Sequence, residues 1–335
     1  MKRTSLMIAV VSAFCFGFSG PMAKVLDAAG LTPLEAVWVR MLGSAVLLFA
    51  VLAVVRPGAL RVPRARFGLV ATYALIAIGA VQALFFVAIT RLPVGIALLI
   101  EFTSPVMVVL WVRFVRRIRP GRGAYAGAVI ALIGLGIVVQ VWQGMRLDAL
   151  GLLAAFAAAA GCAGYFLIND AFGDDLDPLG LITWGFAGAT MMLLPIARPW
   201  HIRWTIFGET VTLGGHTLPV LAAAGWLIVV ATVTAYILGV AAVRRLSAAV
   251  GSTVASLEVI CGAVVAWALL GETLGAAQIV GGLVVIAGAL FAQSAARGVS
   301  RSTADSLAQR TISPAPSGAL SRSLASAATA PESEV

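Results

Sequence analysis

The feature that most restricts the fold of this chain is a series of ten apolar runs, each long enough to cross a bilayer. A hydrocarbon core of about 30 Å needs roughly 20 apolar residues in helical form. Backbone groups in lipid must be satisfied within their own segment, so we expect each run to be a helix. We therefore predict an all-α integral membrane protein with ten transmembrane helices, at residues 5–24, 34–55, 68–89, 93–113, 123–142, 148–169, 179–197, 218–242, 246–269 and 275–295.

The composition excludes a water-soluble domain. Hydrophobic residues make up 61% of the chain and charged residues 11%, against roughly 45–50% and about 25% in soluble domains. The net charge is +9, but the basic residues stand in short runs between apolar segments, so we expect no nucleic-acid partner. The three cysteines lie far apart within apolar runs and are expected to be packing residues. No metal-ligand spacing or phosphate-binding loop is present in the sequence, so neither a metal nor a cofactor is predicted.

The basic residues predict the orientation of the chain. If the N-terminus lies in the cytoplasm, the cytoplasmic segments carry 17 Lys and Arg residues and the external segments carry 5. The positive-inside rule then places both termini in the cytoplasm. We expect the protein to lie in the inner (plasma) membrane of the cell. The N-terminal run resembles a signal peptide but lacks a small-residue cleavage site, so we expect an uncleaved first helix.

The chain compares well with itself at an offset of 154 residues. Under this shift Arg91 meets Arg245, Gly121 meets Gly275 and Gly127 meets Gly281. Five spans per half is an odd number, so the second half must be inverted in the membrane, an architecture known from secondary transporters. We predict one five-helix repeat at residues 1–145 and an inverted one at 146–295. Residues 296–335 are rich in Ser and Ala and are predicted to be a disordered cytoplasmic tail.

Two segments carry a family resemblance. The stretch "RRLSAAVGSTVASLEVICGAVVAWALLGETLGAAQIVGGLVVIAGALF" resembles the second repeat of the drug/metabolite transporter superfamily, EamA type. The stretch "RLPVGIALLIEFTSP" is similar to the threonine/homoserine exporter branch. The resemblance implies two EamA-like repeats with a functional basic residue in the second span. The chain departs from the superfamily pattern at one point, because the superfamily often has a Glu-Pro pair in the fourth span of each repeat. Here the second repeat has the acid without the proline, in Glu258-Val259, and the first repeat has the proline without the acid, in Ser104-Pro105.

An acid and a proline share the fourth span. Glu101 lies about 12 Å deep, where a charged residue costs about 2.5–3.5 kcal/mol to insert. Such a carboxylate should face a cavity, meet a cation or take up a proton; otherwise it is a structural acid bonded to a neighbouring helix. Pro105 has no N–H, so the carbonyl of Glu101 four residues earlier is predicted to be free. In "GFSGP", Pro21 stands in the same relation to Gly17, although either proline could simply bend its helix.

Four further polar residues lie within predicted spans. Arg40 is expected to neutralise Glu101 or to bind a substrate carboxylate, unless it snorkels to the interface. Glu258 in the ninth span is a second candidate acid, one turn out of register with Glu101. Gln82 and Tyr236 align at the 154-residue offset and are expected either to bind a polar solute or to join helices.

These features favour a secondary transporter that exports small polar metabolites such as amino acids, threonine or homoserine among them, by alternating access. Its predicted partners are the solute, protons where transport is proton-coupled, and the lipid bilayer, and a homodimer is compatible with the sequence. A broad-specificity exporter of drugs or lipophilic cations is the alternative. An enzyme is not expected, because no nucleophile–base pair is visible. The sequence does not identify the substrate, the direction of transport or the coupling ion.

Overall fold

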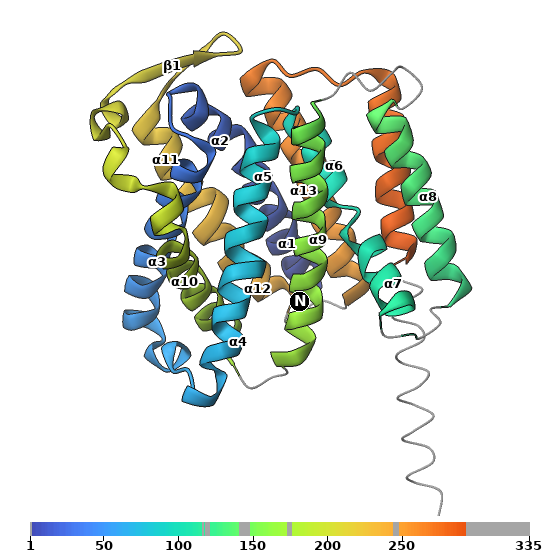
Figure 1. Ribbon diagram of the computed structural model, residues 1–335, viewed down its shortest axis with the longest axis horizontal. Coiled ribbons are helices and arrows are strands. Elements are labelled where there is room, and N and C mark those ends of the chain that lie inside the picture. Colours follow the sequence, from blue (N-terminus) through green and yellow to red (C-terminus); the bar gives the residue numbers. More distant parts are fainter. Residues whose placement is uncertain are drawn as a thin grey trace, which may run out of the picture.

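The computed structural model describes residues 2–115, 117, 121–140, 148–172, 176–243 and 248–292, and it is a bundle of long helices (Figure 1). Within these residues seven helices are long and apolar enough to cross a membrane, namely Leu6–Ala28, Pro33–Val55, Arg64–Ile89, Val94–Phe114, Arg122–Val139, Pro178–Ala197 and Val220–Ala242. Three shorter apolar helices are Ala149–Gly164, Leu257–Leu270 and Ala276–Ala292. The chain is therefore a predominantly helical, multi-pass membrane protein. The predicted tail at 296–335 lies outside the described residues.

The helices of the first half follow the predicted apolar runs within a few residues. In chain order they are α1 (Lys2–Gly17), α2 (Ser19–Ala28), α3 (Pro33–Val55), the 3₁₀ turns η1 (Pro57–Leu60) and η2 (Arg64–Arg66), α4 (Phe67–Thr72), η3 (Tyr73–Ala80), α5 (Val81–Ile89), α6 (Val94–Glu101), α7 (Ser104–Phe114) and α8 (Arg122–Val139).

The second half is built in the same way, with one addition. Its elements are α9 (Ala149–Phe172), α10 (Pro178–Ala197), the 3₁₀ turns η5 (Pro199–His201) and η6 (Trp204–Gly208), β1 (Thr210–Leu213), β2 (His216–Pro219), α11 (Val220–Ile228), η7 (Val229–Thr234), α12 (Ala235–Val243), α13 (Ala248–Leu270) and the last helix, Ala276–Ala292.

The added feature is a β-hairpin, so the chain is predominantly helical and departs from the predicted all-α class at this connection. Strands β1 and β2 pair antiparallel and are joined by Gly214 and Gly215. Both glycines have positive φ, 55° and 83°, as a two-residue hairpin turn requires. A Cβ on Gly214 would lie 2.6 Å from the carbonyl oxygen of Leu269, so the hairpin rests on the end of α13. We call this the hairpin end of the bundle; it contains residues 29–32, 90–93, 198–219 and 271–275.

Two spans are broken near their middle, each just before a proline. The first breaks at Phe18 between α1 and α2, and the fourth at Phe102–Thr103 between α6 and α7. Pro105 occupies the first turn of α7, where a missing N–H costs little because no helical acceptor is available for it. Pro105 thus stands at the start of a helix, whereas Pro21 is the third residue of α2.

Two π-helical segments occupy matching places in the two halves. Element η3 ends at Ala80 and η7 ends at Thr234, so the two ends differ by the same 154 residues that align the halves. Each is followed by an α-helix, α5 in the first half and α12 in the second. Such wide turns are rare and occur frequently at functional sites.

Glycines join α8 to the last helix, which lies beside it in Figure 1. A Cβ on Gly127 would be 2.7 Å from the Gly288 carbonyl oxygen, and one on Gly134 would be 2.8 Å from that of Gly281. Gly127 and Gly134 are the 154-residue counterparts of Gly281 and Gly288. Each glycine therefore contacts the counterpart of the other, the pattern that a two-fold axis produces.

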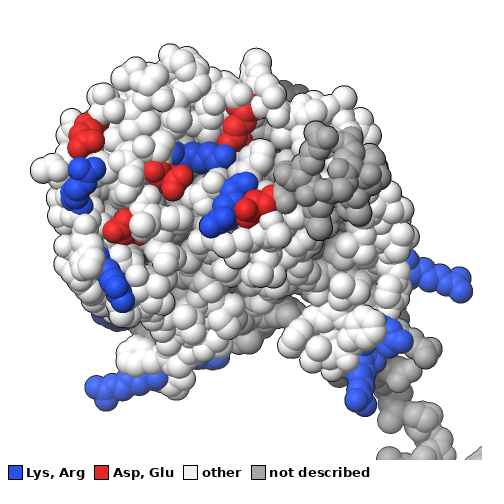
Figure 2. Space-filling view, turned by 45° about the horizontal axis from the view of Figure 1, so that its top comes forward, with Lys and Arg blue, Asp and Glu red and all other residues white. Residues whose placement is uncertain are grey.

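Charged side chains gather at the ends of the bundle. Figure 2 shows acidic and basic side chains mixed on the face that carries the hairpin end, while those at its lower and right edges are basic. At the opposite end Arg56 makes an ion pair of 3.1 Å with Asp177. Between the ends lies one large hydrophobic core contributed by both halves.

Candidate functional site

The candidate site is built around Arg40, which helix α3 carries into the core. Helix α3 starts at a capping box in which Thr32 and Glu35 bond each other's backbone N–H groups. Arg40 stands two turns further on, about 10 Å along the helix. Its side chain is 1% exposed, so it does not snorkel to the interface.

The guanidinium of Arg40 is held by both halves of the chain. Its Nε–H donates to Thr232 Oγ1 at 2.8 Å, and Nη1 donates to Gln82 Oε1 at 2.7 Å. Its central carbon lies 5.5 Å from the centre of the Phe86 ring, a cation–π distance. A guanidinium has five N–H donors, so three of them make no hydrogen bond within the described part of the chain.

Two carboxylates face this cation without pairing with it. Glu101 ends α6 and Glu258 lies in α13; both interact electrostatically with Arg40, and Glu101 also with Glu258. Among the described residues neither acid forms an ion pair with Arg40. The cation and the two acids therefore share one region of the core without forming an ion pair among the described residues.

Other polar groups surround the same place. Tyr236 of α12 interacts electrostatically with Arg40 and packs its ring edge-on against Phe16 and Phe186. The Ser104 side chain, at the start of α7, interacts with the Cys162 thiol of α9. That thiol also interacts with both carboxylates, so α9 lines this region as well.

Ser44 adds an unsatisfied group one turn beyond Arg40 on α3. It is fully buried, and its Oγ has no hydrogen-bond partner among the residues that the structure describes. Buried hydroxyls of this kind are uncommon and call for a specific explanation.

The structure thus gathers five of the eight residues predicted for the site, Arg40, Gln82, Glu101, Tyr236 and Glu258. Pro105 lies just beyond Glu101 at the start of α7 and has no N–H to offer the Glu101 carbonyl. Pro21 is a buried residue in the first turn of α2, and Gly17 serves a helix contact. A Cβ on Gly17 would lie 2.8 Å from both Cys261 Cβ and the Gly262 nitrogen, so this glycine serves the contact of α1 with α13.

Thr232 and Ser44 were missed by the sequence reasoning. Thr232 aligns with Ile78 at the 154-residue offset, so the repeat gives no signal for it. A small hydroxyl in an apolar span is also ordinary, since Ser and Thr commonly join helices in membranes. Only the fold reveals that Thr232 touches the guanidinium.

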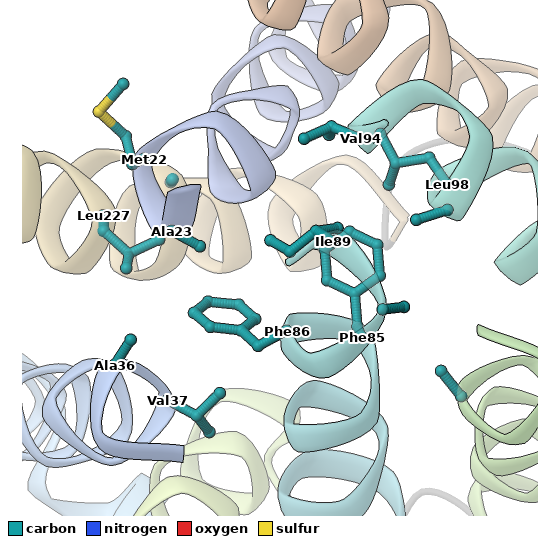
Figure 3. Packing of buried hydrophobic residues seen from close by; sticks show 14 of the residues in the cluster. Met22, Ala23, Ala36, Val37, Phe85, Phe86, Ile89, Val94, Leu98 and Leu227 are labelled. Atoms are coloured by element: carbon teal, nitrogen blue, oxygen red, sulfur yellow. The ribbon is translucent and has the colours of Figure 1, made fainter. Parts of the chain in front are cut away.

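An apolar layer separates the polar cluster from the hairpin end. Figure 3 shows side chains of α2, α3, α5, α6 and α11 packed together, with Met22, Ala23, Ala36, Val37, Phe85, Phe86, Ile89, Val94, Leu98 and Leu227 labelled. Val37 precedes Arg40 by three residues, and Leu98 precedes Glu101 by three, on helices that both start at the hairpin end. The layer therefore lies about one turn closer to that end than the charged residues.

A second set of contacts joins the helices at the hairpin end itself, and we call these contacts the latch. Glu272, just after α13, forms an ion pair with Lys24 of α2. Its other oxygen accepts the backbone N–H of Val94 at 2.8 Å, at the first residue of α6, where a helix favours negative charge. One carboxylate of the second half therefore ties together two helices of the first half.

A cavity of about 420 Å³ between α3 and α11 is a different feature. It is lined almost entirely by apolar groups, including Trp38, Leu42, Gly43, Trp204 and Ile228. Neither Arg40 nor the two acids line it, so it is not the polar site. Among the described residues no group of three or more His, Cys, Asp or Glu side chains could hold a metal ion.

Comparison with known protein families identifies the chain. The model of the EamA-like transporter family matches residues 3–140 and again residues 149–293. The chain belongs to the EamA-like transporter family. As an EamA-like protein it is a membrane transporter and not an enzyme.

Several curated proteins are similar to this EamA-like chain. The threonine/homoserine exporter RhtA of Salmonella typhimurium strain SL1344 is 30% identical over 222 residues, which are 64% of this chain and 68% of that protein. RhtA of Escherichia coli K12 is 28% identical over 211 residues, 61% and 64% of the two chains. The uncharacterized transporter YwfM of Bacillus subtilis strain 168 is 25% identical over 298 residues, 87% and 94%.

A solved crystal structure has the same fold. Its chain superposes with a TM-score of 0.58 at 16% sequence identity, covering 89% of this chain and 99% of its own. At that identity the likeness concerns the fold alone.

Proposed function

We propose that this EamA-like protein is a secondary transporter that exports small amino-acid-like solutes by alternating access. The observation that carries the proposal is the buried Arg40, with three unused N–H donors, near two carboxylates with which it does not pair. A zwitterion fits this pattern because its carboxylate can take the donors of Arg40 while its ammonium lies beside Glu101 and Glu258. The relatives named threonine/homoserine exporters support the same class of solute.

The proposed architecture has ten spans in two inverted halves, with the site between them near the midplane. The reciprocal glycine contacts of α8 and the last helix support a two-fold relation between the halves. The matched π segments η3 and η7 support it as well. We place the protein in the inner membrane with both termini in the cytoplasm, because basic residues dominate the segments on that side.

In this orientation the hairpin end faces outward and is closed. The apolar layer and the latch separate the polar cluster from the outside, so a solute reaches Arg40 from the cytoplasm. Export then requires the Lys24–Glu272 ion pair and the Val94 bond to break while the cytoplasmic end closes. When the solute leaves, its ammonium no longer neutralises Glu101. A proton taken up by Glu101 would then neutralise the carboxylate, which is costly to leave charged within the membrane.

Counterflow in proteoliposomes tests this proposal. Labelled threonine or homoserine should accumulate in vesicles preloaded with the same unlabelled amino acid, and Arg40→Gln and Glu101→Gln should reduce the rate at least tenfold. The matched control is Glu209→Gln, because Glu209 is exposed at the hairpin and far from the cluster. Normal exchange by both site variants would contradict the proposed roles of Arg40 and Glu101.

The same vesicles decide between solute classes. Lipophilic cations have no carboxylate to accept the free donors of Arg40, so we expect dyes and quaternary ammonium compounds neither to exchange nor to compete. If they exchange and the amino acids do not, the protein is a drug exporter and the amino-acid proposal is wrong.

A further inference from the structure

The hydroxyl of Thr232 has an unusual set of partners. It is fully buried, accepts the Nε–H of Arg40 at 2.8 Å and lies 2.7 Å from the Leu227 carbonyl oxygen. A hydroxyl has one proton, and a carbonyl can only accept. The proton of Thr232 therefore goes to Leu227, and an oxygen lone pair is directed at Arg40.

The π-helical turn of η7 makes this arrangement possible. Threonines in α-helices bond the carbonyl of residue i−3 or i−4, as Thr72, Thr183 and Thr190 do here with residues four positions earlier. Thr232 instead bonds a residue five positions earlier, the spacing of a π-helix. In the wider turn the Thr232 hydroxyl donates its proton to the Leu227 carbonyl. The hydroxyl oxygen can then still accept the N–H of the Arg40 guanidinium.

Anchoring Nε has a geometric consequence for Arg40. The guanidinium is planar and its donors form a rigid fork, so a fixed Nε–H and one fixed Nη1–H settle the orientation of the plane. Thr232 supplies the first of these bonds from the second half, and Gln82 supplies the second from the first half. The donors left over all lie on the two terminal nitrogens, which can bind a carboxylate with two hydrogen bonds.

We propose that Thr232 is a positioning residue, which holds the guanidinium of Arg40 so that its terminal nitrogens face the carboxylate of the solute. This rests on the proposed function, since it needs Arg40 to bind that carboxylate. Thr232 itself does not touch the solute. Its contribution is to the affinity for solutes with a carboxylate and to their selection over analogues without one.

The decisive variant is Thr232→Val, which keeps the shape of the side chain and removes the acceptor. We expect the KM for threonine counterflow to rise about tenfold, a change of ~1.4 kcal/mol, with the maximal rate within about twofold of wild type. Loss of binding that is equal in ground and transition states has this signature. The preference for threonine over its carboxamide in competition should fall by a similar factor.

Three comparisons make the test specific. Thr232→Ser keeps the hydroxyl and should restore the KM and the selectivity. Thr183→Val is the matched control, because Thr183 is equally buried and bonds only its own helix, at Leu179; it should leave both quantities unchanged. Thr232→Ala removes the acceptor without the second methyl group and replaces the valine variant if that variant does not assemble.

The outcomes separate this inference from the proposed function. If Arg40→Gln abolishes exchange while Thr232→Val keeps the wild-type KM and selectivity, the positioning role is wrong and the proposed function stands. An effect of Thr183→Val as large as that of Thr232→Val would reduce the role of Thr232 to packing. If the wild-type protein exchanges no carboxylated solute, the proposed function fails and the positioning role fails with it.

Discussion

Replacing Glu272 with glutamine should open the hairpin end of the bundle. Glutamine has nearly the shape of glutamate and can still accept the N–H of Val94, but it loses the charge that both partners of Glu272 use. The Lys24 and Glu272 side chains are 22% and 16% exposed, so water screens their ion pair only in part.

The magnitude follows from two contacts. A hydrogen bond to a charged group contributes about 1.5–3 kcal/mol and one between neutral groups about 0.5–1.5 kcal/mol. The bond to Val94 therefore weakens by about 1 kcal/mol. The partly screened bond to Lys24 loses at least about 1 kcal/mol, because glutamine has one acceptor oxygen where glutamate has two; the total is at least ~2 kcal/mol. That free energy corresponds to an increase of about thirtyfold in the ratio of open to closed molecules.

Cys261 is a native cysteine whose labelling can report the opening. It lies on α13 directly against Gly17 and is partly exposed within its apolar helix, where we expect a membrane-impermeant reagent to arrive from outside when α1 and α2 move away from α13. Its modification by a membrane-impermeant maleimide applied to the outer face can be followed by peptide mass spectrometry. When reclosing is fast, the labelling rate is proportional to the open fraction, so it should rise about thirtyfold.

The matched control is Asp148→Asn at the same end of the bundle. Asp148 pairs with Arg91 at 3.3 Å, but their side chains are 40% and 43% exposed, and such pairs contribute little. Labelling of Cys261 should therefore stay within about twofold of wild type in this variant. A Glu272→Gln protein that labels no faster than this control would refute the reasoning about the latch.

Two further predictions concern stability. The backbone N–H of Gly151, followed by Arg91, lowers the pKa of Asp148; this stabilisation is present above the ordinary pKa of aspartate and is lost as the pH falls through the lowered one. Asp148→Ala should therefore reduce the melting temperature at neutral pH, by an amount that disappears in acid. Gly288→Val should destabilise the protein by at least about 1–3 kcal/mol, because its Cβ would lie 2.3 Å from the Ala131 nitrogen. Gly136→Ala, where a Cβ meets nothing within 4 Å, should be neutral or stabilising in the same assay, and a loss as large as that of Gly288→Val would contradict the packing argument.

The helical architecture was predictable because the bilayer imposes it on any run of about 20 apolar residues. The two breaks were also signalled, since a proline removes a backbone donor wherever it stands. Their form was not, because the sequence is compatible both with a helix broken at the proline and with one that only bends. The hairpin was overlooked because two strands of only four residues each, on either side of a Gly-Gly pair, give a short signal beside strong helical ones.

The candidate site was predictable residue by residue but not contact by contact. Arg40, Glu101 and Glu258 are conspicuous because a charge in an apolar run is costly. Their separation, and the choice of Gln82 and Thr232 as partners of Arg40, depend on how distant helices pack. The π-helical turn at Thr232 has no sequence signature of its own, because packing decides whether a backbone bond spans four or five residues.

The glycine contact between α8 and the last helix has a consequence for the energetics of transport. In a cycle where the two halves exchange roles, Gly127 against Gly288 becomes Gly281 against Gly134, which is the other half of the same contact. The same two glycine contacts are therefore present in both end states. The free energy that they contribute is equal in the two states and cancels from the equilibrium between them. This helix contact can therefore be strong without favouring either end state. The equilibrium between the two states is then determined by contacts that have no counterpart in the other half, such as the latch.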